Sequence, residues 1–365
     1  MIKNISDFPG ANETERITKG IEYLKKNPGC TLSFTAGTYR IDSAIDFSGA
    51  GNATIDGNGA TVLFNPQSGA FTVSGGKDIT IRNLTLEPAK NTFLCGKILS
   101  ADTLGMNLMF DEADRESAAD ILPGTEMLVF SHNEERFTKS IVSGKIDFSE
   151  DGSVRMRGDY PPALSADKIC IPFKEEKTPA IHIDNSENIT IETINIFGGV
   201  RGVICTDSKD IFMNRVMVVP APGEGMSTSD AGGIFEKCRG ALKIKNCVFE
   251  GQGCDALKLN CENTEISGST MRNNFGSAVV ITAMNALIEG CFFDGGVLAA
   301  VNAVTDKNSS LTIQNNRIIR RGEKYRFPAE NDAGGIHVSG HERRSRDVLQ
   351  AAVRPHRRAQ RKNVI

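Results

Sequence analysis

The sequence predicts an all-β fold, a right-handed parallel β-helix or solenoid, and three observations carry the prediction. Short β-branched runs recur about every 22 residues between Thr178 and Gly340, a period typical of repeat architectures. A second series of similar runs is interleaved with the first. The chain also holds 36 glycines, which suit the many tight corners of a solenoid. Because one coil cannot bury its apolar face alone, stacked coils must share one continuous core.

Both series lie in the second half of the chain and are punctuated by Gly, Asn and Asp, as in parallel β-solenoids. The first series occupies residues 180–183, 202–205, 232–235, 256–259, 278–281, 299–302 and 334–338. The second occupies residues 188–191, 210–213, 241–244, 286–289 and 311–313. We therefore assign residues 177–340 to the main coils.

Residues 1–89 are predicted to hold an N-terminal capping helix and the first coils. Residues 13–26 place three apolar side chains on one helical face, after Asn12 as N-cap and before Pro28-Gly29 as a stop. A helix there would cover the open end of the solenoid, as terminal repeats must. Strand-like segments follow at residues 31–41, 53–63 and 78–86.

The period vanishes in residues 90–176, which we assign to an inserted β-subdomain, built as a small barrel. This segment is more charged than the coils and too long for one of them. Residues 126–130 and 154–157 resemble strands, and residues 159–162 form a turn signal. The alternative is a set of disordered loops, against which the apolar content of the segment argues.

Residues 341–365 form a basic tail that abandons the strand pattern. Eight Lys and Arg against two carboxylates give the tail a charge of +6, and the rest of the chain then carries −9. A partner-binding tail is one interpretation. A reading-frame error or a truncation that removed further coils is the interpretation that we favour.

Composition bounds the other functional classes. No apolar run is long enough to span a membrane. The N-terminus lacks a secretory signal, so we expect a cytoplasmic protein or a chain that begins after a removed leader. Basic and aromatic residues are not interleaved in the body, so nucleic-acid binding is not expected. The sequence does not indicate the oligomeric state.

The nine cysteines are odd in number and show no metal-ligand spacing. Cys247 and Cys291 fall at the same place in their repeats. We therefore expect inward-facing cysteines in the core, with a disulfide framework as the alternative. The sequence predicts no metal and no cofactor.

Two carboxylates are the candidate catalytic residues. Asp230 and Asp255 each stand just before corresponding strands on consecutive coils, and adjacent strands lie about 4.8 Å apart. We expect their carboxyl groups to lie roughly 5–9 Å apart, a range that covers both glycosidase geometries. Like charges this close raise one pKa and can supply both an acid and a base. The other interpretation is that each is an ordinary turn residue that bonds its own backbone.

Several polar residues on the same face are candidate ligands of a sugar. The predicted substrate-binding residues are Arg201, Glu224, Ser229, Lys258 and Asn260. Lys258 could instead pair with Asp255. Asp207, Glu224 and Glu250 are fallback carboxylates that are more often solvated loop charges, and we expect His182 and His337 to be structural.

The segment from residue 179 to residue 260 resembles glycoside hydrolase family 110, the inverting α-1,3-galactosidases, and the solenoid as a whole resembles pectate-lyase-like folds. The matching motifs are Ser227-Thr-Ser229, Asp230-Ala231, Cys238-Arg-Gly240, Asn246-Cys-Val-Phe-Glu-Gly251 and Cys254-Asp-Ala-Leu-Lys258. The resemblance implies a hydrolase that releases terminal α-linked galactose-type residues from a carbohydrate substrate. It places Asp230 and Asp255 at catalytic positions without assigning their roles.

The sequence departs from the family pattern at three substituted positions and by one extra residue between the Asp-Ala motif and Cys238. Cys254 stands where the family has a first aspartate of a pair, Lys258 where it has Asn, and Asn260 where it has His. A thiol does not replace a carboxylate at neutral pH unless its pKa is strongly shifted. A non-catalytic carbohydrate-binding module and a polysaccharide lyase with Ca²⁺ and a Lys or Arg base therefore stay open as alternatives.

Overall fold

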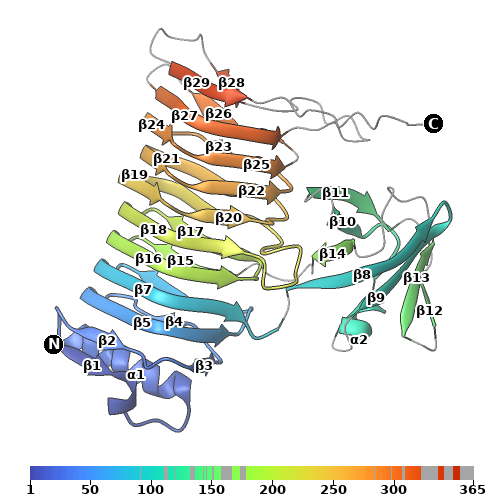
Figure 1. The fold of residues 1–365 in the computed structure, drawn as a ribbon. Helices are drawn as coiled ribbons and strands as arrows, with labels where there is room; N and C mark the ends of the chain where they lie inside the picture. The colour runs from blue at the N-terminus through green and yellow to red at the C-terminus, as the bar shows by residue number, and fades with distance from the viewer. Residues whose placement is uncertain are drawn as a thin grey trace.

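The protein is a stack of parallel coils with a second sheet attached to its side (Figure 1). The computed structural model describes residues 1–90, 92–110, 114–119, 121–131, 136–142, 144, 146–149, 152–157, 167–172, 178–283, 285–296, 298–305, 309–321, 336–340 and 348–353. In this part of the chain, 22 strands form the solenoid and seven form the attached sheet. The predicted right-handed parallel β-helix is confirmed.

The solenoid strands pair in parallel from coil to coil. They are β1 (Ile2–Asn4), β2 (Thr31–Ser33), β3 (Thr38–Ile41), β4 (Ile45–Asp46), β5 (Gly51–Phe64), β6 (Phe71–Ser74), β7 (Lys77–Pro88), β15 (Pro179–Asp184), β16 (Glu187–Phe197), β17 (Arg201–Thr206), β18 (Lys209–Val219), β19 (Gly233–Lys245), β20 (Val248–Glu250), β21 (Leu257–Ser267), β22 (Thr270–Asn274), β23 (Val279–Ile281), β24 (Asn285–Glu289), β25 (Phe292–Gly296), β26 (Val301–Thr305), β27 (Ser310–Arg321), β28 (Ile336–Gly340) and β29 (Val348–Val353). Every predicted run of both series overlaps one of these strands.

The core consists of inward-facing residues stacked in register. In β16 buried and partly exposed residues alternate, and its inward Ile189 and Ile191 lie level with Ile79 and Ile81 of β7. Burying such a side chain fully contributes about 1.5–3 kcal/mol. Because each coil repeats the same inward positions, the burial runs through the stack as one cluster.

Single residues with positive φ bend the long strands around a corner. Asn83, Thr193 and Arg215 occupy equivalent positions in β7, β16 and β18, with φ between 53° and 58°. A left-handed residue breaks the two-residue alternation, so inward positions on both sides of the corner face the same core. Asn adopts this conformation readily, whereas a β-branched Thr does so against its preference.

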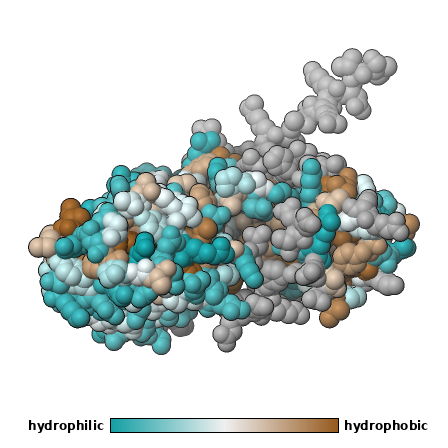
Figure 2. Space-filling view, turned by 90° about the horizontal axis from the view of Figure 1, so that it is seen from below, coloured by the Kyte–Doolittle hydropathy of each residue, from teal (hydrophilic) through white to brown (hydrophobic). Residues whose placement is uncertain are grey.

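A helix closes the N-terminal end of the stack. α1 (Glu13–Lys26) coincides with the predicted helix, and the Asn12 side chain accepts a hydrogen bond from Glu15 N at 2.8 Å. A short 3₁₀ helix, η1 (Ile5–Asp7), precedes it. The buried face of α1 consists of Ile17, Gly20, Ile21 and Leu24. Seen from this end in Figure 2, the solenoid presents mostly hydrophilic residues, as expected of a terminal cap.

The attached sheet is antiparallel and is inserted between β7 and β15. Its strands, in spatial order, are β11 (Arg136–Ile141), β10 (Glu126–Ser131), β14 (Lys168–Pro172), β8 (Phe93–Asp102), β9 (Gly105–Phe110), β13 (Ser153–Arg157) and β12 (Ile146–Phe148), and a short helix α2 (Arg115–Ala118) accompanies them. In the described residues β11 and β12 are edge strands, so the sheet is open where the sequence favoured a small barrel. The predicted turn at residues 159–162 lies outside the described residues.

One small apolar cluster joins the attached sheet to the coils. Phe93, Cys95, Leu128 and Cys170 of the sheet pack with Met226 of the solenoid. This contact brings the sheet against the loop that precedes β19. The sheet therefore borders the segment in which the candidate residues lie.

The last coils end in β28 and β29, which pair with β26 and β27. Residues 348–353 of the predicted tail thus continue the solenoid, and the rest of residues 341–365 lies outside the described residues. All nine cysteines are unbonded thiols, and eight are buried, which confirms the prediction of core cysteines. None of the described helices has the length and apolarity to cross a membrane.

Candidate functional site

The two candidate aspartates lie in neighbouring coils, where loops lead into β19 and β21. These strands pair in parallel with Gly233 level with Leu257. Counting back from this pair along both segments places Asp230 level with Cys254, so Asp255 is one residue further on. The small offset expected from the sequence is therefore present.

Buried polar groups fix the two loops. Gln252 has no exposed surface, and its Nε2 lies 2.9 Å from Val218 O and 2.8 Å from Ser227 Oγ. Gly253 N donates to Thr228 O at 2.7 Å, and Asp230 N donates to Val200 O at 2.9 Å. The backbone at both aspartates is thus held by hydrogen bonds to the preceding coil.

A lysine lies between the two carboxylates. Lys258 Nζ is 3.5 Å from Asp230 Oδ1 and 3.8 Å from Asp255 Oδ2. These two oxygens are therefore at most 7.3 Å apart, the sum of the two distances. The bound agrees with the separation expected from the sequence and admits both glycosidase geometries.

Asp230 has a second cation beside it. Arg201 Nε donates to Asp230 Oδ2 at 2.8 Å, and the Asp230 side chain is only 13% exposed. Two positive charges against one half-buried carboxylate stabilise its ionised form. Arg201, predicted as a sugar ligand, thus contacts a catalytic candidate directly.

Asp255 has a different environment. Burial raises the pKa of its carboxyl above the ordinary value, and the charge of Asp230 adds to the rise. A hydrogen bond from Ser277 N to Oδ1 at 2.7 Å and the charge of Lys258 oppose it without cancelling it. The side chain is 16% exposed. Asp255 therefore holds its proton to higher pH than an ordinary aspartate does.

Cys254 contacts Asp255 but does not replace a carboxylate. Its Sγ lies 3.8 Å from Asp255 Oδ2. Burial raises the pKa of the Cys254 thiol, and the charge of Asp255 raises it further, so the group stays protonated at neutral pH. The position that carries a family aspartate is uncharged here.

Lys258 stays charged in this setting. Burial lowers the pKa of its ammonium group, but the charges of Asp230 and Asp255 and a hydrogen bond with the Cys254 side chain together raise that pKa above its ordinary value. The pairing with Asp255 that the sequence left open is therefore present. Together, the site holds one carboxyl biased towards its neutral form and one carboxylate held by two cations, which is a usable acid and base.

Two of the other predicted ligands lie close to the attached sheet or next to Asp230. Glu224 Oε2 is 3.9 Å from Lys168 Nζ of β14. This oxygen atom is buried and has no hydrogen-bond partner in the described residues. Glu224 lines a cavity of about 30 Å³ together with Thr92 and Met226. Ser229 is half-buried, and its backbone N donates to Gly199 O at 3.3 Å.

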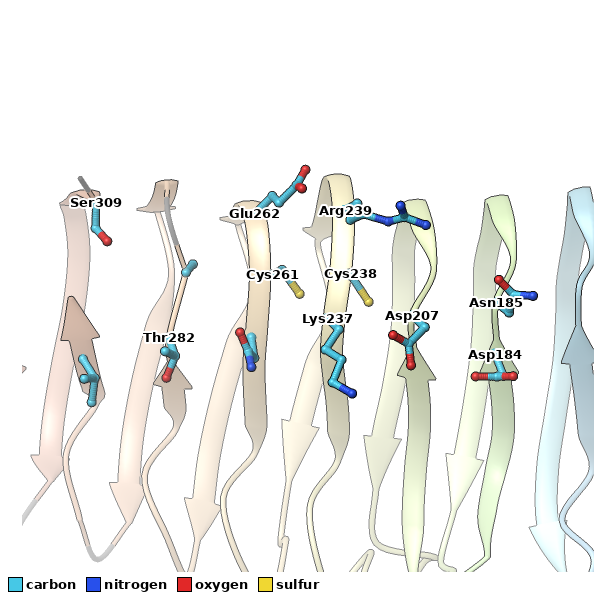
Figure 3. Close-up of a pocket in the computed structure, with 13 residues that line it drawn as sticks. Asp184, Asn185, Asp207, Lys237, Cys238, Arg239, Cys261, Glu262, Thr282 and Ser309 are labelled. Atoms are coloured by element: carbon cyan, nitrogen blue, oxygen red, sulfur yellow. The ribbon is translucent and has the colours of Figure 1, made fainter. Parts of the chain in front are cut away.

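Asn260 lies further along β21, in a groove of about 940 Å³ that also includes the fallback Asp207 (Figure 3). Figure 3 shows Asp184, Asp207 and Lys237 on neighbouring coils of this groove. Neither Asp230 nor Asp255 lines it. Asn260 is two residues beyond Lys258 on the same outward face of β21, so the groove lies further along this strand than the acid pair.

The remaining candidates do not join the site. Glu250 forms an ion pair with Arg272 at 2.6 Å on the next coil. His182 is a half-buried residue of β15. The side chain of His337 lies outside the described part of the structure.

The sequence did not lead us to the residues of the next coil, Gly276 and Ser277, that contact Asp255. Ser277 N donates to Asp255, and Gly276 lies directly below it, since a Cβ on Gly276 would come within 2.3 Å of Asp255 Oδ1. Ser277 is 22 residues after Asp255, so the repeat period was the signal that could have identified it. In the described residues no group of three or more His, Cys, Asp or Glu is arranged to hold a metal ion.

Comparison with known proteins agrees with the fold. The family model described as a right handed beta helix region matches residues 232–339. The Agl-KA catalytic domain superimposes with a TM-score of 0.57 at 10% identity, over 96% of this chain and 53% of that one. At this identity the likeness shows the fold alone.

The curated relatives that match by sequence include two α-1,3-galactosidases from different bacteria. Alpha-1,3-galactosidase A of Shewanella woodyi is 22% identical over 311 residues, which cover 70% of this chain and 50% of that protein. Alpha-1,3-galactosidase B of Bacteroides thetaiotaomicron is 22% identical over 316 residues, which cover 71% and 50%. This chain thus spans about half the length of each relative. The chain is a right-handed parallel β-helix whose sequence resembles the α-1,3-galactosidases.

Proposed function

We propose that the chain is an inverting glycoside hydrolase that acts on terminal α-linked galactose-type residues of glycans. The observation that carries the proposal is the pair Asp230 and Asp255, which share one lysine but differ in environment. The names of the curated relatives support the choice of sugar and linkage.

The different environments of the two aspartates support a division of roles between them. Asp255, whose pKa is raised by burial, protonates the glycosidic oxygen as the bond from the anomeric carbon breaks. Asp230, held ionised by Arg201 and Lys258, takes a proton from the water that attacks the anomeric carbon. The proton given by Asp255 leaves with the aglycone, and the two carboxyl groups exchange protons with water before the next turnover.

The surroundings suit a small polar ligand. Arg201 and Lys258 bring donors to the pair, and Ser229, whose hydroxyl is a further candidate donor, directly precedes Asp230 in the chain. The chain has no Trp and four Tyr, so stacking of sugar rings on aromatic side chains should contribute little to binding. The groove at Asn260 offers room along the coils for the rest of a glycan.

The test compares two leaving groups. Purified wild type, Asp230→Asn and Asp255→Asn are assayed on an unactivated α-1,3-linked digalactoside and on a nitrophenyl α-galactoside. We expect both variants to lose about 10²-fold or more on the disaccharide. Asp255→Asn should retain far more activity on the nitrophenyl substrate, because that leaving group needs little acid assistance.

The control variant is Glu22→Gln, which removes an exposed carboxylate of α1, the helix that caps the N-terminal end of the solenoid. It should keep near wild-type turnover. If all three variants lose activity equally, or if neither aspartate matters for an active wild type, the assignment of the pair is wrong.

Glycan binding without turnover is a second candidate, favoured by Lys258 and Cys254. The ammonium of Lys258 contacts both carboxylates, and Cys254 is a protonated thiol at a position where the family has an aspartate. Calorimetric binding of the digalactoside by folded wild type, with no galactose released, would favour this role over hydrolysis.

A further inference from the structure

Cys95 and Cys170 lie opposite each other at the base of the attached sheet. Cys95 belongs to β8 and Cys170 to β14, and the two residues are direct partners in an antiparallel pair. Their Sγ atoms are 3.3 Å apart. Both side chains are buried in the cluster that joins the sheet to the solenoid.

The hydrogen-bond pattern identifies the kind of pair. Ile98 N donates to Asp167 O at 2.8 Å, so residues 98 and 167 form a hydrogen-bonded pair. Hydrogen-bonded and non-hydrogen-bonded pairs alternate along an antiparallel ladder, which makes Cys95 and Cys170 a non-hydrogen-bonded pair. In such pairs the Cα atoms are about 4.5 Å apart, within the span that a disulfide bridges.

We propose that Cys95 and Cys170 form a disulfide across β8 and β14 when the protein meets a low-molecular-weight disulfide such as oxidised glutathione. One cysteine attacks the glutathione disulfide and releases one reduced glutathione. The second cysteine then attacks the mixed disulfide and releases another. Two protein thiols are oxidised, one glutathione disulfide is reduced, and the protons end on the two released thiols.

The position gives the bond a structural consequence. The chain enters the insertion through β8 and leaves it through β14, and we call these two adjacent strands the neck of the insertion. The bond would join the two strands of the neck and close a loop over a separation of 75 residues. Met226 belongs to the same apolar cluster as both cysteines and lies in the loop that holds Asp230. Oxidation would therefore fix the base of the attached sheet next to this loop, whether or not the chain is a hydrolase.

A second close pair provides an internal comparison. Cys205 and Cys238 have Sγ atoms 3.8 Å apart in the solenoid core. Cys205 is level with Phe235, however, and Cys238 is level with Cys261, so these two cysteines are not partners across a ladder. We expect this pair to stay reduced where Cys95 and Cys170 are oxidised.

The experiment refolds the full chain in a glutathione redox buffer and maps its disulfides by mass spectrometry after digestion without reductant. We expect one peptide that links Cys95 to Cys170 and the loss of two free thiols. Cys95→Ser and Cys170→Ser should each abolish the link, and Cys30→Ser, a buried cysteine elsewhere, should keep it. Free, alkylated Cys95 and Cys170, or a link between Cys205 and Cys238 instead, overturns the proposal.

A second measurement needs no variant. The oxidised wild type should unfold at a midpoint higher by about 5 °C than the reduced protein, because the bond restricts a long loop in the unfolded chain. Proteolysis within the insertion should also leave its fragments linked until a reductant is added. An unchanged midpoint together with released fragments contradicts the bond at the neck.

Discussion

Replacing Lys258 with Met removes the charge that the two aspartates share, and it should destabilise the fold at neutral pH. Lys258 Nζ lies 3.5 Å from Asp230 and 3.8 Å from Asp255. With an effective dielectric constant of about 20, each contact corresponds to about 4–5 kcal/mol of Coulomb energy. Desolvation of the lysine offsets much of this, and its side chain is 35% exposed. We therefore expect a net loss of about 1–2 kcal/mol at pH 7.

The stability that Lys258→Met loses relative to the wild type should become smaller as the pH falls. The folded-state pKa of Asp255 is raised above 3.8, so the folded state binds this proton more tightly than the unfolded state does. Its contribution to stability is full below the unfolded pKa and is lost as the pH rises through the folded pKa. Without Lys258 that folded pKa rises further, because an attraction that opposed the rise is removed. The variant should therefore approach wild-type stability as the pH falls towards 4.

Urea unfolding of both proteins between pH 4 and pH 8 measures the difference. Lys243→Met is the matched control, since Lys243 is an exposed residue of β19 and the loss of its charge should change stability by less than about 0.5 kcal/mol. Equal unfolding free energies for Lys258→Met and wild type across the pH range would refute the electrostatic account of the site.

Three further perturbations have expected outcomes. Gly276→Ala should lower activity by at least about tenfold in a folded protein, since the added Cβ would come within 2.3 Å of Asp255 Oδ1. Gly51→Ala is the control, because the nearest atom to its added Cβ is 3.8 Å away. Unchanged kinetics for both variants would contradict the placement of Asp255. Phe249→Ala should cost about 3–5 kcal/mol in urea unfolding, because the ring is fully buried; a cost below about 1 kcal/mol would mean that the core is not packed there. Asp56→Asn should destabilise by about 1 kcal/mol at pH 7. Burial raises the pKa of Asp56, but hydrogen bonds from Asn83, Asn58 and Arg82 outweigh it and lower that pKa, so the difference from wild type should shrink as the pH falls below 3.8 and should not grow.

The period of the sequence was sufficient to predict the coils. The runs at 180–183 and 188–191 became β15 and β16, because repeated β-branched residues need neighbours above and below to bury them. The cap was equally local, since the spacing of Ile17, Ile21 and Leu24 and the side chain of Asn12 define α1 without reference to the rest of the chain. Residues 90–176 lack that period, and their antiparallel order depends on contacts far apart in sequence.

Only the part of the site that follows from the register between coils could be predicted from the sequence. Asp230 and Asp255 were placed on neighbouring coils because the period fixes which residues are stacked. Glu224 was grouped with them, but the packing of Met226 against the attached sheet draws this loop towards Lys168. The sequence left Lys258 as either a sugar ligand or a partner of Asp255, and only the loop geometry places it within reach of both aspartates.

The most direct measurement follows the wild-type protein and an unactivated α-1,3-linked digalactoside by proton NMR from the first minutes of reaction. We expect free galactose to appear first as the β-anomer, because water activated by Asp230 attacks the face opposite to the bond that Asp255 protonates. Release of the α-anomer first, or no galactose from protein shown to be folded, would contradict it.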